Sequence, residues 1–443
     1  MKTDKNHGWR ARRLRDLVQV KHGYAFKGEF FADSGPYVLL TPGSFYDEGG
    51  FRDRGEKEKY YVGPVDDEYI LRKGDLIVAM TEQAEGLLGS SALIPEDGRY
   101  LHNQRLGLVV PIRRDECDTR FLYHLFNWRE VRTQIRASAS GVKVRHTSPS
   151  RIGEIEVRVP PLEVQRRVAE ILCAYDSLIQ NNNSRIGVLE EMVRTIYREW
   201  FVEFRGPGVR LRRATTAEKK VTAQDMFPVG WELKPIGDVV ETMGGGTPST
   251  KVDEYWADGE IIWFTPSDLT AVGAMFITNS AKKITPLGLD ESSARMFPPY
   301  SVMMTSRATI GVTAINTGPA CTNQGFITCI ANDRLSAYQI YFWIEEHKEE
   351  ISSIASGATY KEISRSEFRE LHIVIADLEF SRRFAEIVSP LAAEIENLLA
   401  RNDNLRRTRH FLLPRLISGE VSIENVDIPA ADESVQEVAE VNK

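Results

Sequence analysis

Apolar side chains recur at alternating intervals of four and three residues along two long stretches of the chain, residues 162–204 and 378–420. This spacing is the heptad pattern of a coiled coil, in which one stripe of each helix faces a partner helix. The stripe of the first stretch consists of Val168, Leu172, Tyr175, Ile179, Asn182, Ile186, Leu189, Val193, Ile196 and Trp200. The stripe of the second consists of Phe384, Val388, Leu391, Ile395, Leu398, Asn402, Leu405, Arg409, Leu412 and Leu416. A helix of roughly 40 residues is about 60 Å long, so each stretch is predicted to form a rod.

The two stretches are copies of one another. Their first residues are identical at a constant offset of 216, namely Leu162/Leu378, Glu163/Glu379, Arg166/Arg382, Arg167/Arg383, Ala169/Ala385, Glu170/Glu386 and Ile171/Ile387. A repeat of this length predicts a chain that is built twice. Because neither apolar stripe can comfortably stay exposed, the two helices are predicted to pack on each other.

The polar exceptions in the stripes indicate the direction of packing. With Val168 opposite Leu416 in an antiparallel pair, Asn182 falls opposite Asn402, whereas a parallel register places it opposite Leu398. A buried amide without a partner costs about 1–3 kcal/mol, and a paired core Asn is a device that fixes register. The sequence therefore predicts an antiparallel pair with Asn182 and Asn402 facing each other. The alternative is that both Asn side chains reach solvent.

The rest of the chain forms two similar units of mixed secondary structure. Residues 1–160 contain β-like runs at 37–41, 75–80, 106–112 and 154–159, with a helical pattern at 119–135. Residues 227–376 repeat several markers, among them Gly230-Trp231 for Gly8-Trp9, Asn323-Gln324 for Asn103-Gln104, and Ser356-Gly357 for Ser140-Gly141. The second helical pattern, at 335–351, matches the first in position. The sequences between these markers differ strongly, as expected for two copies of one fold with different ligands.

The predicted fold class is therefore α+β, with two similar mixed α/β domains joined by a long antiparallel two-helix coiled coil. The predicted boundaries are a first domain at 1–160, a central helix at 161–205, a linker at 206–226, a second domain at 227–376, a C-terminal helix at 377–420 and an acidic, mostly disordered tail at 421–443. The linker prediction rests on its Gly, Pro, Thr and charged residues. Pro390 interrupts the second helix and predicts either a kink, which the unbroken register favours, or a fresh start capped by Ser389. Pro414 is predicted to distort or end the last turns.

Composition is that of a globular protein, with 42% hydrophobic and 27% charged residues. No apolar run reaches the roughly 20 residues of a membrane helix, and the N-terminus lacks the apolar segment of a secretory signal. The four Cys residues show no metal spacing and are predicted to be reduced core thiols of a cytoplasmic protein. The formal net charge is −7, so nucleic-acid contact requires local basic faces.

No motif in the chain predicts catalysis or a metal site. The tetrapeptide Phe297-Pro298-Pro299-Tyr300 is similar to that of amino-methyltransferases, but those need a polar first residue to bind the target amine. The stretch Gly244-Gly245-Gly246-Thr247-Pro248 lacks the Gly-Lys-Ser/Thr of a phosphate-binding loop. The absence of catalytic constellations favours a recognition protein.

Candidate nucleic-acid contacts lie in loops bounded by Gly and rich in basic or hydroxyl side chains. Lys and Arg bind phosphates, and Arg can also read guanine edges. The candidates are Lys143, Arg145 and Thr147 in one loop, Thr359, Tyr360 and Lys361 in its counterpart, Thr247, Ser249 and Lys251 after the Gly run, and Ser306 with Arg307. Solvated surface loops are the competing interpretation for each of them.

The chain resembles the specificity subunit of type I restriction-modification systems. The resemblance rests on residues 160–172, 200–204, 245–249, 263–269 and 412–420, and on the duplicated layout. The second helix departs from the family pattern, since Ala376-Asp377 replaces Pro-Pro and Ser381 replaces Gln, which affects helix initiation only.

The resemblance implies that each domain is a target-recognition domain that reads one half of a split site in double-stranded DNA. The helix pair would set the gap between the halves and dock two modification (methyltransferase) subunits, with restriction subunits outside them. The chain itself would carry no cofactor and catalyse nothing, while S-adenosylmethionine would bind the partner subunits that methylate adenine. The alternatives are a specificity or scaffold subunit of a related DNA-defence assembly and a solitary adenine methyltransferase.

Overall fold

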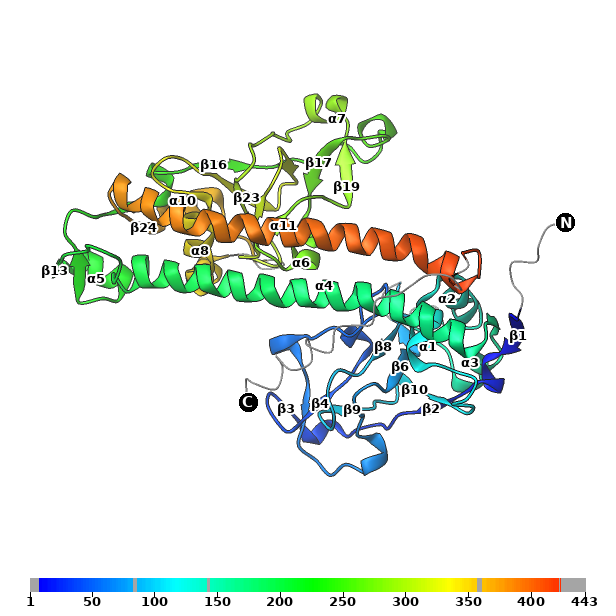
Figure 1. The fold of residues 1–443 in the computed structure, drawn as a ribbon. Coiled ribbons are helices and arrows are strands. Elements are labelled where there is room, and N and C mark those ends of the chain that lie inside the picture. Colours follow the sequence, from blue (N-terminus) through cyan, green and yellow to red (C-terminus); the bar gives the residue numbers. More distant parts are fainter. Residues whose placement is uncertain (1–7, 83–85, 142–143, 357–360, 422, 424–443) are drawn as a thin grey trace. The chain divides into compact units, whose positions relative to one another are not determined.

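The computed structural model describes residues 8–82, 86–141, 144–356, 361–421 and 423. The predicted disordered tail, 421–443, therefore lies almost wholly outside the described residues. The chain divides into two compact units, Met1–Gln180 with Asn402–Lys443 and Asn181–Arg401. Each unit combines one segment of each long helix with mixed sheets and short helices, so the predicted α+β class is confirmed (Figure 1).

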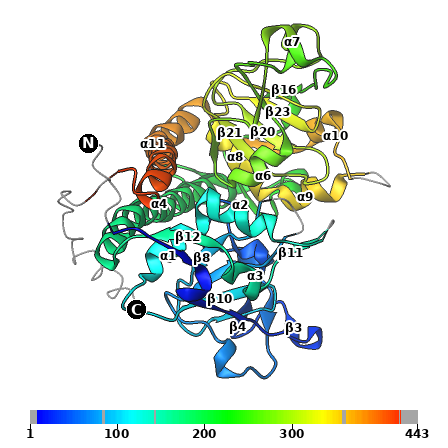
Figure 2. The ribbon, with the colours of Figure 1, turned by 90° about the vertical axis from the view of Figure 1, so that its right-hand side faces the viewer.

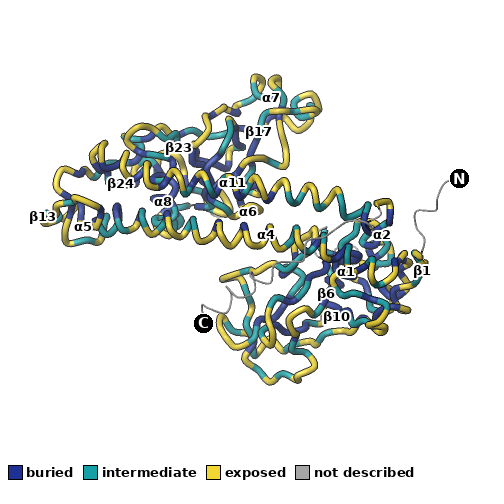
Figure 3. Tube along the Cα trace, viewed as in Figure 1, coloured by how far each residue is buried: buried dark blue, intermediate teal, exposed yellow. Residues whose placement is uncertain are grey.

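Described strands of the first unit form two four-stranded sheets, in the orders β2-β10-β6-β8 and β3-β5-β4-β9, and two strand pairs, β1-β12 and β11-β7. The strands are β1 (Arg10–Arg13), β2 (Val18–His22), β3 (Phe31–Ala32), β4 (Tyr37–Leu39), β5 (Tyr60–Tyr61), β6 (Leu76–Ala79), β7 (Thr81–Glu82), β8 (Ser91–Leu93), β9 (Tyr100–Leu101), β10 (Leu106–Pro111), β11 (Arg145–His146) and β12 (Glu156–Val159). The helices are α1 (Thr119–Asn127), α2 (Arg129–Ala137) and α3 (Pro149–Gly153). Strand β6 is buried along its whole length (Figure 3), because Leu76 and Val78 on one face and Ile77 and Ala79 on the other belong to two different apolar clusters.

Described strands of the second unit form sheets in the orders β16-β23-β20-β21-β18 and β19-β17-β22, with pairs β13-β14 and β15-β24. The strands are β13 (Leu211–Arg213), β14 (Met226–Pro228), β15 (Glu232–Pro235), β16 (Glu241–Gly244), β17 (Ile261–Phe264), β18 (Phe276–Ile277), β19 (Lys282–Ile284), β20 (Val302–Thr305), β21 (Thr313–Asn316), β22 (Cys321–Thr322), β23 (Phe326–Ile330) and β24 (His372–Ile375). The helices are α5 (Thr216–Thr222), α6 (Pro266–Val272), α7 (Pro286–Asp290), α8 (Ala337–Glu346), α9 (Lys348–Ile354) and α10 (Arg365–Glu370). The run β16-β23-β20-β21 repeats the order of β2-β10-β6-β8, and β15-β24 repeats β1-β12. The duplication predicted from the markers is therefore a duplication of the fold.

The two predicted rods are α4 (Leu162–Tyr197) and α11 (Leu378–Ile417), which lie side by side (Figures 1 and 2). A π-helical turn, Arg198–Val202, follows α4. Helix α11 runs through Pro390 without a break, so the alternative of a fresh start capped by Ser389 is wrong, and the kink stays a prediction. The helix also includes Pro414 and ends at Ile417, within one turn of it, and a distortion of these last turns stays a prediction. The Ser389 hydroxyl donates to Ala385 O at 2.6 Å, one turn before the proline ring.

The helices pack antiparallel, as predicted. Contacts between their side chains occur in opposite order along the two chains: Trp200 with Phe384, Arg185 with Glu394, and Asp176 with Arg409. Asn182 and Asn402 are 9% and 0% exposed, which argues against the alternative that both reach solvent. Their pairing with each other stays a prediction.

Two predicted helices are each divided by one residue. The pattern at 119–135 forms α1 and α2, and the pattern at 335–351 forms α8 and α9. Trp128 adopts extended backbone (φ −68°, ψ 132°), which interrupts the helical hydrogen bonds, and His347 occupies the equivalent break. Apolar periodicity did not reveal either break, because the helices on both sides bury apolar faces against the same core.

The predicted linker contains regular structure. Strands β13 and β14 pair around helix α5, whose capping box joins Thr215 and Glu218. Arg212 donates to both carboxylate oxygens of Glu218, at 2.8 and 2.6 Å. These hydrogen bonds lower the pKa of Glu218 to about 2. The polar residues that predicted a linker therefore form the cap and the ion pair of a small folded hairpin.

The four Cys residues are free thiols, and Cys117, Cys321 and Cys329 are buried. Burial raises the pKa of Cys117 to about 11 and of Cys329 to about 12, so both stay protonated. None of the described helices has the length and apolarity needed to cross a membrane.

Two buried histidines predict a dependence of stability on pH. Burial lowers the pKa of His102 to about 4 and of His124 to about 3. In the unfolded chain a histidine titrates near 6.5, so between pH 6.5 and 4 the unfolded state binds protons that the folded state does not. Stability is therefore complete above pH 6.5 and falls as the pH falls, by roughly 2 kcal/mol for His102 alone at pH 5.

Urea unfolding of the wild type and of His102→Gln at pH 7 and pH 5 measures this loss, with exposed His372→Gln of the second unit as the control. The pH-dependent loss is expected to be smaller in His102→Gln than in the other two proteins. Equal losses in all three would contradict the assignment.

Candidate nucleic-acid interface

Segments far apart in the sequence meet at the end of β6 in the first unit. Backbone hydrogen bonds run from Tyr24 N to His102 O (2.9 Å), from Met80 N to Arg105 O (3.0 Å) and from Thr147 N to Met80 O (2.9 Å). We call residues 23–24, 80–82, 102–105 and 145–147 the first loop cluster. The bonds fix four loops against one another without involving any side chain.

The second unit repeats this arrangement at the end of β20. Backbone hydrogen bonds run from Gly246 N to Thr322 O (2.9 Å), from Ser306 N to Gly325 O (2.8 Å) and from Ile363 N to Ser306 O (3.1 Å). We call residues 245–249, 305–307, 322–325 and 361–363 the second loop cluster. Candidates predicted from three separate loops, Thr247, Arg307 and Lys361, therefore belong to one cluster, and Arg145 belongs to the equivalent cluster of the first unit.

Arg145 lies among other charged residues. It is opposite Glu82 in the β11-β7 pair, and its Nη2 donates to Arg136 O at 3.1 Å. Arg136 lies 3.6 Å from the Glu82 carboxylate. The Glu82 carboxylate offsets the charge of Arg136, so the Arg145 guanidinium adds a positive charge that suits a phosphate.

Sequence reasoning missed two residues that hold the segment 86–88 in place. The Glu82 carboxylate is 4% exposed and accepts hydrogen bonds from Gly86 N (3.2 Å) and Leu88 N (2.9 Å). Arg132 of α2 donates to the carbonyl oxygens of Asp47 and Gly86. Neither residue belongs to a sequence motif. The role of a buried Glu or a half-buried Arg can be recognised only once its distant partners are known.

Arg307 supplies the guanidinium of the second cluster. Its Nε donates to Glu362 at 2.6 Å, and the two side chains are 45% and 43% exposed. The β-bridge between the same residues fixes the backbone beneath them. Lys361 is exposed beside the pair. An exposed ion pair contributes about 0–1 kcal/mol, so Arg307 can exchange its partner for a phosphate at small cost.

Two tryptophans hold the loop that carries Thr247, Ser249 and Lys251. Trp263 Nε1 donates to Gly246 O at 2.9 Å, and Trp256 Nε1 donates to Ser249 O at 3.1 Å. The three predicted residues are exposed on the loop. The Thr247 hydroxyl donates to Gln324 Oε1 at 2.6 Å.

Two of the candidates are not surface residues. Thr147 and Ser306 are 6% and 3% exposed, because each lies at a backbone junction of its loop cluster. Their backbone groups hold the loops together. Because both side chains are buried, the prediction that they face DNA is wrong. Lys143, Thr359 and Tyr360 lie outside the described residues.

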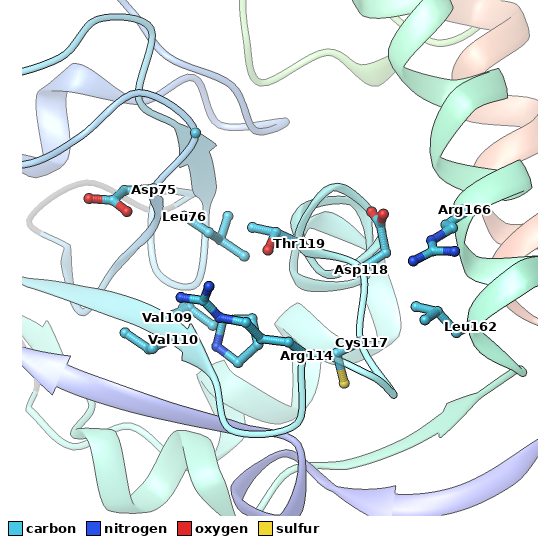
Figure 4. Close-up of a pocket in the computed structure, with 12 residues that line it drawn as sticks. Asp75, Leu76, Val109, Val110, Arg114, Cys117, Asp118, Thr119, Leu162 and Arg166 are labelled. Carbon is cyan, nitrogen blue, oxygen red and sulfur yellow. The ribbon is translucent and has the colours of Figure 1, made fainter.

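A cavity of about 420 Å³ lies in the first unit beside the start of α1 and the start of α4 (Figure 4). Its charged lining consists of two guanidinium groups and two carboxylates, from Arg114, Arg166, Asp75 and Asp118. The charges balance, so the cavity offers no net attraction for a phosphate. The cavity lining includes the thiol of Cys117, which burial keeps protonated.

The tetrapeptide similar to that of amino-methyltransferases has a structural role. Phe297 is 3% exposed and bridges to Ala320, and the Tyr300 hydroxyl donates to Glu396 of α11 at 3.3 Å. Among the described residues there is no group of three His, Cys, Asp or Glu side chains able to hold a metal ion.

Duplicated α+β domains with equivalent loop clusters and a pair of antiparallel helices define a class of recognition proteins. The comparison with family models gives the particular family: residues 6–191 and 228–407 match the type I restriction modification DNA specificity domain. The chain belongs to this family and is a non-catalytic DNA specificity subunit of a type I restriction-modification system.

Individual relatives agree with this assignment. The chain is 35% identical over 192 residues to the type I restriction enzyme MjaIX specificity subunit of Methanocaldococcus jannaschii, an alignment that covers 43% of this chain and 44% of that protein. It is 23% identical over 341 residues to the HindI specificity subunit of Haemophilus influenzae, covering 65% of this chain and 73% of the relative. The crystal structure of a type I S subunit from M. genitalium has the same fold, with a TM-score of 0.55 at 15% identity over 94% of this chain and 98% of that one.

Proposed function

We propose that each domain reads one half of a bipartite site in double-stranded DNA and that the α4–α11 pair sets the gap between the halves. The observation that carries this proposal is the repetition of one loop cluster in two domains whose side chains differ. The same backbone bonds present Arg145 beside Arg136 in one cluster and Arg307 with Lys361 in the other. Equal scaffolds with unequal side chains suit two different half-sites.

The protein partners in this proposal are two modification subunits and, outside them, restriction subunits. The modification subunits bring S-adenosylmethionine and methylate adenine, because the described residues of this chain contain no matching set of catalytic groups. The assembly acts in the cytoplasm, where the free thiols of this chain stay reduced.

The long helices offer apolar surface to such partners. Large apolar side chains on them remain at least 40% exposed, namely Leu178, Val188, Met192, Leu378, Ile387 and Phe411. Val188 and Met192 lie one turn apart on α4 and are 61% and 47% exposed. A pair of this kind on a helix suits an apolar partner surface.

Replacing Val188 and Met192 by glutamate is expected to abolish copurification with the modification subunit, because two charges would be buried in the interface. Each lost apolar contact weakens binding roughly tenfold or more. The side chains are exposed in the chain alone, so its own unfolding temperature is expected to stay unchanged. Glu191→Gln, in the same turn, is the matched control. Normal copurification of the double variant would contradict this docking surface.

The Arg307 side chain tests DNA binding by the second cluster. In the complex with modification subunits, Arg307→Ala is expected to lower affinity for duplex DNA and to flatten the plot of log K against log salt concentration by about 0.9, the value for one lost phosphate contact. Arg334→Ala is the matched control, since Arg334 is 51% exposed and forms a similar ion pair with Glu232 in the same unit. Identical salt slopes for the two variants would contradict the assignment of the second cluster to DNA.

A further inference from the structure

One turn is repeated in both loop clusters while the residues around it have changed. It is Asn103-Gln104 between β9 and β10, and Asn323-Gln324 between β22 and β23. The residues that precede the turns are His102 and Thr322, and those that follow are Arg105 and Gly325. The two central residues have therefore kept their identity in domains that otherwise diverged.

The asparagine of each turn has a structural explanation. Asn103 Oδ1 accepts from Arg105 N at 3.0 Å, and Asn323 Oδ1 accepts from Gly325 N at 2.9 Å. This bond from an Asn side chain to the backbone two residues on is a standard turn-forming interaction. The fold alone accounts for an asparagine at both positions.

A glycine facing each turn is explained in the same way. A Cβ on Gly23 would lie 2.3 Å from Asn103 O, and a Cβ on Gly245 would lie 2.2 Å from Asn323 O. Both distances are shorter than any real contact, so only glycine lets the neighbouring loop approach. The repeated close approach places the two turns at the same position in their clusters.

The fold does not account for the glutamine. Gln104 and Gln324 are exposed, and a turn requires no particular side chain at that position. In the second unit the Thr247 hydroxyl donates to Gln324 Oε1 at 2.6 Å, and no described residue accepts a hydrogen bond from its Nε2. The hydrogen bond from Thr247 therefore orients the Gln324 side chain and leaves its Nε2–H donors available to a ligand.

Building on the proposed DNA-binding function, we propose that Gln104 and Gln324 donate Nε2–H to phosphate oxygens at equivalent places in the two half-sites. Residues that read bases must differ between domains with different targets, whereas a residue kept in both must contact what the half-sites share. Every half-site presents a sugar–phosphate backbone, and Gln side chains are among its usual donors. The two glutamines then position each domain on its half-site, and the bases are left to side chains that differ between the two domains.

The test uses the full chain in complex with its modification subunits, a duplex carrying the motif that the wild type methylates, and a duplex with both halves scrambled. Gln104→Ala and Gln324→Ala are each expected to lower affinity for both duplexes by the same factor, roughly threefold to tenfold, with the methylated motif unchanged. Exposed Gln19 of β2 is the matched control, and Gln19→Ala is expected to behave as wild type.

A second pair of variants identifies the phosphate directly. Gln104→Lys and Gln324→Lys place a cation at the proposed contact, so the plot of log K against log salt concentration is expected to steepen by about 0.9, while Gln19→Lys leaves it unchanged. A changed base within one half of the methylated motif, or lysine variants with the wild-type slope, would overturn this inference and leave the proposed function intact. Wild-type complex that binds both duplexes equally would overturn the proposed function, and the inference with it.

Discussion

Removing one heptad from each long helix is expected to shorten the gap of the DNA target by about three base pairs and to leave both half-sites unchanged. Seven residues of helix span about 10 Å, and one base pair spans about 3.4 Å. The heptad register places residues 177–183 of α4 opposite 401–407 of α11, so this pair of deletions keeps the remaining stripes in register. Sequencing of methylated adenines in cells that express the variant with its modification subunit gives the gap and both halves at once.

The position of the cuts follows from the contacts of the second unit. Glu190 of α4 accepts from Met275 N at 2.8 Å, and Glu396 of α11 accepts from the Tyr300 hydroxyl at 3.3 Å. Deletions nearer these residues would detach the helices from the domain. Deleting residues 177–183 alone is the control, because it takes the stripes out of register and is expected to abolish methylation. A double deletion that changes the half-sites while the gap stays the same would refute the ruler role of the helices.

Replacing Arg409 by alanine is expected to destabilise the first unit by about 3 kcal/mol, because it leaves the partly buried Asp176 carboxylate without its cation. The two side chains are 12% and 25% exposed, and Arg409 Nη1 donates to Asp176 Oδ1. Arg409 also lies 3.6 Å from Glu48, whose loop includes Asp47, an acceptor for Arg132. Thermal unfolding of this unit is expected to shift down by on the order of 10 °C.

The matched variant replaces both partners by leucine. A buried ion pair exchanged for apolar side chains of similar size is often neutral, so Arg409→Leu with Asp176→Leu is expected to recover most of the unfolding temperature. If Arg409→Ala unfolds at the wild-type temperature, or if the double replacement is as unstable as Arg409→Ala, the ion pair does not hold the helices in this unit.

The same residue illustrates what the sequence could predict. Heptad spacing predicted both rods, because burial of an apolar stripe depends on spacing within one segment, and the positions of Asn182 and Asn402 in the stripes predicted their antiparallel packing. It also placed Arg409 in the stripe, but it could not identify Asp176 as its partner, since a packing register fixes positions only to within about one turn. Pro390 shows the same limit, because the sequence left a kink and a fresh start both open, and only the folded helix shows that α11 continues through it.

The loop clusters depend on contacts between distant segments. Arg145, Arg307 and Lys361 could be predicted because basic residues in Gly-bounded loops suit phosphates. Glu82 could not, since its role comes from the backbone amides of Gly86 and Leu88. The repeated Asn-Gln pairs were visible as sequence markers, but the exposure of the glutamines and the structural role of the asparagines emerged only from the fold.

Sequencing of methylated adenines in the genome of a host that expresses this chain with its modification subunit shows whether each domain reads one half-site and the helices set the gap. We expect one motif made of two short, different halves separated by a fixed gap, with both halves methylated. A contiguous motif, two halves that vary in spacing, or methylation without sequence preference would contradict the assignment of one half-site to each domain and of the gap to the helices.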